Sequence, residues 1–256
     1  MNGGRRLGIH GPVLAAWCLG LAPPGHSAWA ADPSEYLLLP TVNKGERELD
    51  WHSGIGSSGP TTRSETDSVL GFGWGVTNHW FTELAVRYRQ NAGSGIGIGG
   101  IEWENIFQIR EVGELPVDIG MALKVEQAHD VQNSLSVLAG PLIQKDFGNL
   151  QANFNVLMGR PLDNKGLHTT EIEYQSQLKY RYKEPFEFGV QAFGRLGSNT
   201  QSWVAYPDQI HGIGPVVLGQ FKFPRERSLS YNAGFLFGAT AHSSDRTLRF
   251  QIEYEF

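Results

Sequence analysis

The sequence predicts an all-β protein, a transmembrane antiparallel β-barrel of twelve strands in a single domain. Three observations lead to this prediction. Apolar and polar residues alternate along most of the chain, which is typical of strands. The expected connections alternate between short and long, as they do in bacterial outer-membrane barrels. The last expected strand runs to the final residue, Phe256, with an apolar residue at every second position.

The segment 171–182 (EIEYQSQLKYRY) shows the alternation most clearly. Its odd-numbered residues are polar or charged, and its even-numbered residues are mostly aromatic or aliphatic. Successive side chains of a strand point to opposite faces of the sheet. Such a strand fits a barrel wall with lipid outside and water inside. We therefore expect Tyr174, Leu178, Tyr180 and Tyr182 to face lipid.

The same pattern recurs along the chain. The twelve expected strands cover residues 48–55, 70–76, 80–89, 101–110, 117–126, 134–145, 150–156, 171–182, 186–195, 209–222, 230–237 and 248–256. Besides segment 171–182, the expected lipid-facing residues include, in strand order, Leu49, Trp51 and Ile55; Leu70, Phe72 and Trp74; Trp80, Leu84 and Val86; Ile101, Trp103 and Phe107; Ile119, Met121 and Val125; Leu150, Phe154 and Val156; Phe186, Phe188 and Val190; Tyr231, Phe235 and Phe237; and Leu248, Phe250 and Ile252. In 134–145 and 209–222 the pattern does not decide which residues point inward.

The connections carry the second signal. Tight turns are expected at 77–78, 112–114, 147–149, 183–185 and 224–226. The links that follow the odd-numbered strands are generally longer and rich in Gly, Ser, Asn and Pro, and the longest runs from about 197 to 212. A water-soluble β-sandwich has no reason to alternate in this way, so the pattern favours the membrane barrel, which we assign to residues 44–256.

The N-terminus has the three parts of a secretory signal peptide. A basic pair is followed by an apolar run, 7–21, which is too short and too broken to span a bilayer as a helix. Small residues at Ala28 and Ala30 then mark a cleavage site. We expect residues 1–30 to be removed. Residues 31–43 are expected to form a periplasmic lead-in, lying under the barrel or tucked into its base.

Composition excludes several classes of function. Cys18 is the only cysteine and lies in the expected signal peptide, so the exported chain has no disulfide and no thiolate metal site. The formal net charge is −5, which gives no electrostatic footprint for nucleic acid. We expect no cofactor and no bound metal.

The lumen-facing residues carry both signs of charge. The expected lumen-lining residues are Glu83, Arg87, Glu102, Glu104, Arg110, Asp118, Lys124, Glu126, Glu171, Glu173, Lys179, Arg181, Glu187, Arg195, Arg249 and Glu253. Symmetric tight turns would bring opposite charges together across neighbouring strands, which stabilises a sheet face. The expected pairs are Arg110 with Asp118, Glu104 with Lys124, and Arg181 with Glu187.

Two interpretations of this lumen follow. In the first, the barrel is a passive channel for small polar solutes or ions, because rings of charge give pores their selectivity. A belt formed by Glu102, Glu104, Glu126, Glu171 and Glu173 near the outer mouth then favours cations. In the alternative, paired charges close the lumen, and the barrel is a structural or surface-interaction protein that does not conduct.

An enzyme is a more distant interpretation, because some outer-membrane barrels are hydrolases. Asp50 and His52 share one face of an expected strand, as an acid and a base would, but no nucleophile motif accompanies them. We therefore expect no enzymatic activity. Four histidines lie in or beside the expected outer loops: His129, His168, His211 and His242. No pair of them has the tight spacing of metal ligands, so we interpret them as solvated loop residues.

Several stretches resemble an uncharacterised family of proteobacterial outer-membrane barrel proteins. They are EYLLLPTVNKGERELDWHSG, GVTNHWFTEL, EWENIFQI, ELPVDIG and the terminal TLRFQIEYEF. The last ten residues also resemble the assembly signal of outer-membrane proteins, with Tyr254 and Phe256 as its aromatic positions. The resemblance implies a location in the bacterial outer membrane, with membrane lipid and the barrel assembly machinery as partners. It implies no activity and no functional residues.

Overall fold

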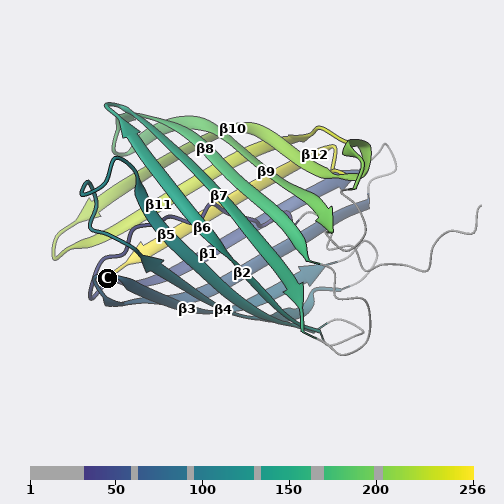
Figure 1. Ribbon diagram of the computed structural model, residues 1–256, viewed down its shortest axis with the longest axis horizontal. Helices are drawn as coiled ribbons and strands as arrows, with labels where there is room; N and C mark the ends of the chain where they lie inside the picture. Colours follow the sequence, from purple (N-terminus) through teal and green to yellow (C-terminus); the bar gives the residue numbers. More distant parts are fainter. Residues whose placement is uncertain (1–31, 59–62, 91–94, 130–133, 163–169, 199–203) are drawn as a thin grey trace, which may run out of the picture. The chain divides into compact units, whose positions relative to one another are not determined.

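The computed structural model describes residues 32–58, 63–90, 95–129, 134–162, 170–198 and 204–256. These residues form twelve strands that close into one antiparallel barrel, which confirms the predicted fold class (Figure 1). Within this part of the chain, no helix is long and apolar enough to cross a membrane. The predicted signal peptide, 1–30, lies outside the described residues and stays a prediction.

The strands are longer than the sequence pattern alone suggests. They are β1 (Arg47–Ser58), β2 (Arg63–Thr77), β3 (Trp80–Gln90), β4 (Gly97–Gln108), β5 (Asp118–Ala128), β6 (Leu135–Phe147), β7 (Leu150–Pro161), β8 (Glu171–Lys183), β9 (Phe186–Ser198), β10 (Ile210–Phe223), β11 (Arg227–Gly238) and β12 (Arg246–Glu255). A short 3-10 helix, η1 (Tyr206–Asp208), precedes β10.

Each strand pairs with its neighbour in sequence, and β1 pairs with β12 to close the ring. This closing pair runs in register from Glu48 opposite Glu255 to Ser57 opposite Arg246. Because the ring is closed, neither strand of this pair is left with the unpaired backbone groups of a sheet edge. That is a requirement for a sheet surrounded by lipid.

The alternation of faces follows the sequence. Leu178 on β8 is 50% exposed, whereas its neighbour Gln177 is buried inside the barrel. The structure also shows which residues point inward on β6, one of the two ambiguous segments. On β6, Leu142 is 0% exposed and pairs with Gly120 and Asn155, two residues of the inner face, so even-numbered residues point inward.

The turns at one end of the barrel, which we call the turn end, are tight after β2, β6, β8 and β10, as expected. They gather at the left of Figure 1. We call the opposite end the loop end. The prediction of a tight turn at 112–114 was wrong, because the link from β4 to β5 spans 109–117. Pro116 has no N–H to give to a ladder, and Gly113, at φ +84°, donates its N–H to Asp118 at 2.8 Å instead.

Residues 32–46, which we call the inner segment, run through the lumen. At the loop end, a Cβ added to Gly54 of β1 would lie 1.9 Å from the carbonyl oxygen of Pro33. At the turn end, a Cβ on Gly75 of β2 would lie 1.9 Å from the carbonyl oxygen of Asn43. Only glycine allows such close approach of two backbones.

The sequence left two positions open for residues 31–43, under the barrel or tucked into its base. Residues 32–43 lie inside the ring of strands, held by side chains of the inner face. Just after them, Gly45 and Glu46 form backbone hydrogen bonds with Gly75. The inner segment fits inside because its irregular backbone finds hydrogen-bond partners among the lumen amides.

Candidate functional site

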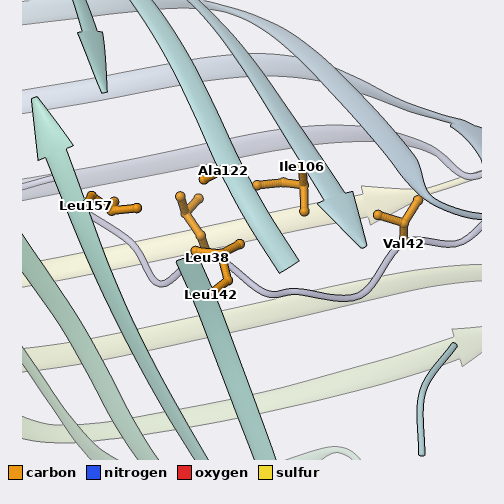
Figure 2. Packing of buried hydrophobic residues seen from close by; sticks show 6 residues of the cluster. All are labelled: Leu38, Val42, Ile106, Ala122, Leu142 and Leu157. Atoms are coloured by element: carbon orange, nitrogen blue, oxygen red, sulfur yellow. The ribbon is translucent and has the colours of Figure 1, made fainter. Parts of the chain in front are cut away.

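The middle of the inner segment packs against an apolar patch on the inner face of the barrel. Leu38 and Val42 form one buried cluster with residues of β4 to β7 (Figure 2). The barrel residues of this cluster are Ile106, Ala122, Leu142 and Leu157. Burial of each apolar side chain stabilises the contact by about 1.5–3 kcal/mol. The lumen is thus partly filled by a dry contact that the predicted charged lining did not include.

Side-chain amides of the wall take the place of a neighbouring strand. The N–H of Leu38 donates to Oε1 of Gln175 at 3.1 Å, and the Leu38 carbonyl accepts from Nδ2 of Asn155 at 2.8 Å. The N–H of Val42 donates to Oε1 of Gln108 at 2.6 Å. Buried backbone groups need such partners, so these amides hold the segment in one register. No sequence signal connects the amides with the segment.

A charge cluster surrounds Arg87 on β3. Its guanidinium contacts Asp32 of the inner segment, Asp67 of β2 at 2.7 Å and Glu102 of β4. Lys124 on β5 completes the cluster, with its Nζ 2.8 Å from Glu102. The cluster therefore ties four neighbouring strands, β2 to β5, and the N-terminal end of the inner segment together.

The cluster continues along the inner segment to Tyr36, whose hydroxyl donates to Oε2 of Glu104 at 2.8 Å. Glu104 also lies 3.5 Å from Nζ of Lys124, its partner in the β4–β5 register. The expected pairing of Glu104 with Lys124 is confirmed. Glu104 is buried and the side chain of Lys124 is 15% exposed. Burial of a charge is costly unless it is paired and hydrogen bonded, as Glu104 is here.

The two other expected pairs are not formed. A bulge at the end of β8 shifts the register between Tyr180 and Lys183. Lys179 therefore bonds Glu187 at 2.9 Å, while Arg181 bonds Asp146 of β6 at 2.9 Å.

Arg110 lies exposed in the link after β4 instead of in the lumen, because β4 ends at Gln108. The carboxylate of Asp118, at the start of β5, accepts the N–H of Gly113 and has no ion pair to Arg110 among the described residues.

The remaining expected lumen residues lie at different heights on the inner face. Arg195 on β9 bonds Glu173 on β8 at 2.9 Å. Arg249 on β12 is buried, with its guanidinium 4.2 Å from the ring centroid of Phe193. Glu126 lies 3.6 Å from Arg87, and Glu171, half-buried, begins β8.

The expected acidic belt is thus mostly neutralised. Four of its five carboxylates have a cation within ion-pair distance: Glu102, Glu104, Glu126 and Glu173. Because Arg87, Lys124 and Arg195 are shared among these four carboxylates, the belt offers a passing ion less negative charge than five free carboxylates would. Any ion selectivity in the lumen therefore depends more on a second set of charged side chains.

That set lines a cavity of about 530 Å³ beside the inner segment, in the half of the lumen towards the turn end. One wall is acidic and includes Glu48 and Asp50 of β1, Glu83 of β3 and Glu253 of β12. Lys179 and Arg181 of β8 stand on the far side of the ring. The cavity is polar and large enough for several water molecules or a small solute.

Asp50 and His52 do meet inside the barrel. The Nδ1 atom of His52 lies 2.8 Å from Oδ2 of Asp50, and the His52 ring packs 4.3 Å from the ring of Tyr36. Among the described residues, no serine hydroxyl hydrogen bonds to His52; the hydroxyl of Ser34 donates to Asp32. Within the described residues, the pair has the geometry of an acid and a base but has no hydroxyl nucleophile bonded to His52.

Two of the loop histidines have hydrogen-bond partners in the described part of the chain. His211 is held by Tyr174 at 3.0 Å and Gln209 at 2.8 Å, and His242 contacts the carbonyl of Pro207 at 3.3 Å. His129 follows β5, and His168 lies outside the described residues.

The last residue of the chain is bonded to the barrel. The N–H of Phe256 donates to the carbonyl of Arg47 at 2.9 Å, and its ring stacks on Tyr254 with centroids 5.9 Å apart. The terminal aromatic pair therefore lies next to the closing seam between β1 and β12. A role as an assembly signal stays a prediction.

Comparisons with known proteins support the architecture. No family model matches the chain, and no curated protein matches it significantly. Among solved structures, it is similar to an outer membrane channel from Pseudomonas putida F1, with a TM-score of 0.58 and 13% identity, covering 88% of this chain and 99% of that one. It is also similar to the NanC porin, with a TM-score of 0.54 and 13% identity, covering 81% of this chain and 98% of that one. Similarity at such identity shows the fold alone: a barrel of the kind found in outer-membrane channels.

Proposed function

We propose that this protein is a passive channel of the bacterial outer membrane that passes small polar solutes or ions, and that it has no enzymatic activity. The observation that carries the proposal is the polar cavity of about 530 Å³ inside a closed transmembrane barrel. Water-filled polar lumens are what passive outer-membrane channels use. The tight turns then face the periplasm, and the loop end faces the outside.

The inner segment sets the width of this channel. It joins the barrel through β1 at Arg47, and its other contacts include the Leu38 and Val42 packing, the amide hydrogen bonds and the pair of Asp32 with Arg87. A solute that passes the lumen must pass beside this segment or move it. Conductance therefore depends on how tightly the segment is docked.

The alternative is a barrel that does not conduct and serves a structural or surface-interaction role. The ion pairs of Arg87, Lys124 and Arg195 favour this alternative, because they leave fewer unpaired charges in the half of the lumen towards the loop end. The buried contact of Leu38 with Leu142 favours it as well, because it blocks part of the cross-section.

Single-channel recording separates the two. The exported protein is refolded and inserted into a planar bilayer with asymmetric KCl, beside a variant that lacks residues 32–40. The proposal expects discrete steps from the intact protein and larger steps from the deletion. Silence from intact protein whose folding is verified, with steps from the deletion variant, identifies a closed barrel. Silence from both folded proteins rejects the channel.

A further inference from the structure

Three carboxylates meet at the base of the acidic wall, near the turn end. Glu46 ends the inner segment, Glu48 lies on β1 and Glu253 lies on β12. One carboxylate oxygen of each lies within 4.8 Å of the others. The three groups thus come from the inner segment and from both strands of the closing seam.

These carboxylates differ from Glu102, Glu104, Glu126 and Glu173 nearer the loop end, which have cationic partners. Glu48 is 8% exposed, and within the described part of the chain no hydrogen bond or ion pair links its carboxylate to another group. The two cations that line the same cavity, Lys179 and Arg181, are bound to Glu187 and Asp146. Burying like charges together is unfavourable unless a cation or protons neutralise them.

A fourth carboxylate, outside this group of three, points to the same conclusion. Glu83 on β3 is 6% exposed, lines the same cavity, and has no hydrogen bond or ion pair with another described residue. Glu48 pairs with Gly73 in the β1–β2 register, and Gly73 pairs with Glu83 in the β2–β3 register. The stem of Glu48 and the ring of Phe81 lie over Gly73, and the carboxylate of Glu83 lies over Gly71, the next inward-facing glycine of β2. Two buried and unpaired carboxylates therefore lie over the same strand at the wall of one cavity.

We propose that Glu46, Glu48 and Glu253 bind a divalent cation of the Ca²⁺ type, with water from the cavity completing the coordination. Carboxylate oxygens are hard ligands, which Ca²⁺ and Mg²⁺ prefer. Oxygens on opposite sides of Ca²⁺ lie about 5 Å apart, and those on Mg²⁺ about 4 Å apart, given metal–oxygen distances of about 2.4 and 2.1 Å. The three oxygens lie within 4.8 Å of one another, a separation that one Ca²⁺ ion can bridge.

The position of this cation gives it a structural consequence. It bridges the end of the inner segment to β1 and β12, the two strands that close the barrel. Binding to the folded protein alone raises stability by mass action. The site therefore strengthens both the docking of the segment and the seam, whether or not the barrel conducts.

The test measures Ca²⁺ binding to the folded protein in detergent by equilibrium dialysis with radioactive calcium, with the thermal unfolding midpoint as a second readout. The variant is Glu48→Gln, and the matched control is Glu114→Gln, an exposed carboxylate in the β4–β5 link at the same end of the barrel. We expect one bound ion per chain in the intact protein and in the control. Loss of a ligand weakens binding by at least about 10- to 100-fold, the range seen for partners outside the first coordination shell.

We also expect Ca²⁺ to raise the unfolding midpoint of the intact protein and of the control, and not that of the Glu48→Gln variant. If the intact protein binds no Ca²⁺ at millimolar concentration, the site does not exist. If Glu48→Gln, verified as folded by circular dichroism, binds as tightly as the control, the assignment of the ligands is wrong. Neither result depends on conductance, so the Ca²⁺ site and the channel proposal are tested independently.

Discussion

Leu38 is the residue whose replacement tests the role of the inner segment most directly. It is 4% exposed and packs against Leu142 and Leu157 of the barrel wall. Replacing a packed leucine by alanine costs about 2–5 kcal/mol, depending on how well the site collapses. Because Leu38 belongs to the segment and not to a strand, the loss falls on docking of the segment while the strand ladder stays intact.

The magnitude follows from this range. Since about 1.4 kcal/mol changes an equilibrium tenfold, Leu38→Ala raises the population with an undocked segment by roughly 30-fold to a few thousandfold. If the segment limits the channel, the frequency of large openings rises in the same proportion until it saturates. The thermal unfolding midpoint of the barrel itself changes little.

Single-channel recording in a planar bilayer measures the frequency of openings, and circular dichroism measures the unfolding midpoint. The matched control is Leu39→Ala. Leu39 is the next residue, but it is 45% exposed and lines the cavity, so its truncation removes little packing. We expect Leu38→Ala to increase large openings and Leu39→Ala to leave their frequency near that of the intact protein.

Two results refute this reasoning. Equal behaviour of the Leu38 and Leu39 variants means that packing in the apolar cluster does not hold the segment. A large drop of the unfolding midpoint in Leu38→Ala, without a change in openings, means that the segment is part of the stability of the barrel and not a gate.

Three further predictions concern the wall, the charge cluster and the terminus. Leu178→Arg is expected to reduce assembly more than Gln177→Arg, because an arginine on the lipid face at mid-membrane costs about 2–4 kcal/mol while Gln177 borders the wet cavity; equal amounts of heat-modifiable folded protein from both contradict the assigned faces. Arg87→Met is expected to lower the free energy of unfolding by about 3–5 kcal/mol, since it leaves Asp67 and its neighbours as buried carboxylates without their main cation; urea titration of the folded barrel measures this, and an unchanged midpoint rules the cluster out as a stabilising element. Deletion of Phe256 is expected to lower the amount that reaches the outer-membrane fraction in cells, because both the proposed terminal signal and the bond to β1 are lost; normal levels in that fraction remove the signal from the explanation.

Local sequence determined the faces of the strands. In segment 171–182 every second residue is polar, and because side chains of a strand alternate strictly between faces, the inward position of Gln177 and the outward position of Leu178 follow without any knowledge of neighbours. The pairing of Glu104 with Lys124 was predicted from a symmetric connection between their strands, and the β4–β5 register keeps that symmetry although the link is longer than expected.

Where a strand is interrupted, the sequence was insufficient. The partner of Arg181 depends on a bulge near the end of β8, which shifts the register by an amount that residue types do not encode. Arg110 left the lumen because Gly113 and Pro116 prolong the link after β4. In both cases the backbone geometry of a few residues changed which side chains meet, although the alternation on either side was predicted correctly.

The sequence by itself therefore determined an all-β barrel with a charged inside and an apolar outside, because alternation is a local property of the chain. Only the tertiary structure decided what occupies the lumen. The inner segment is held by Gln108, Asn155 and Gln175, which lie on β4, β7 and β8, far from the segment in sequence. It passes Gly54 and Gly75, where the missing side chains make room. Such a fit depends on the diameter of the closed ring and on groups that meet only across it. Neither can be inferred from a short stretch of sequence.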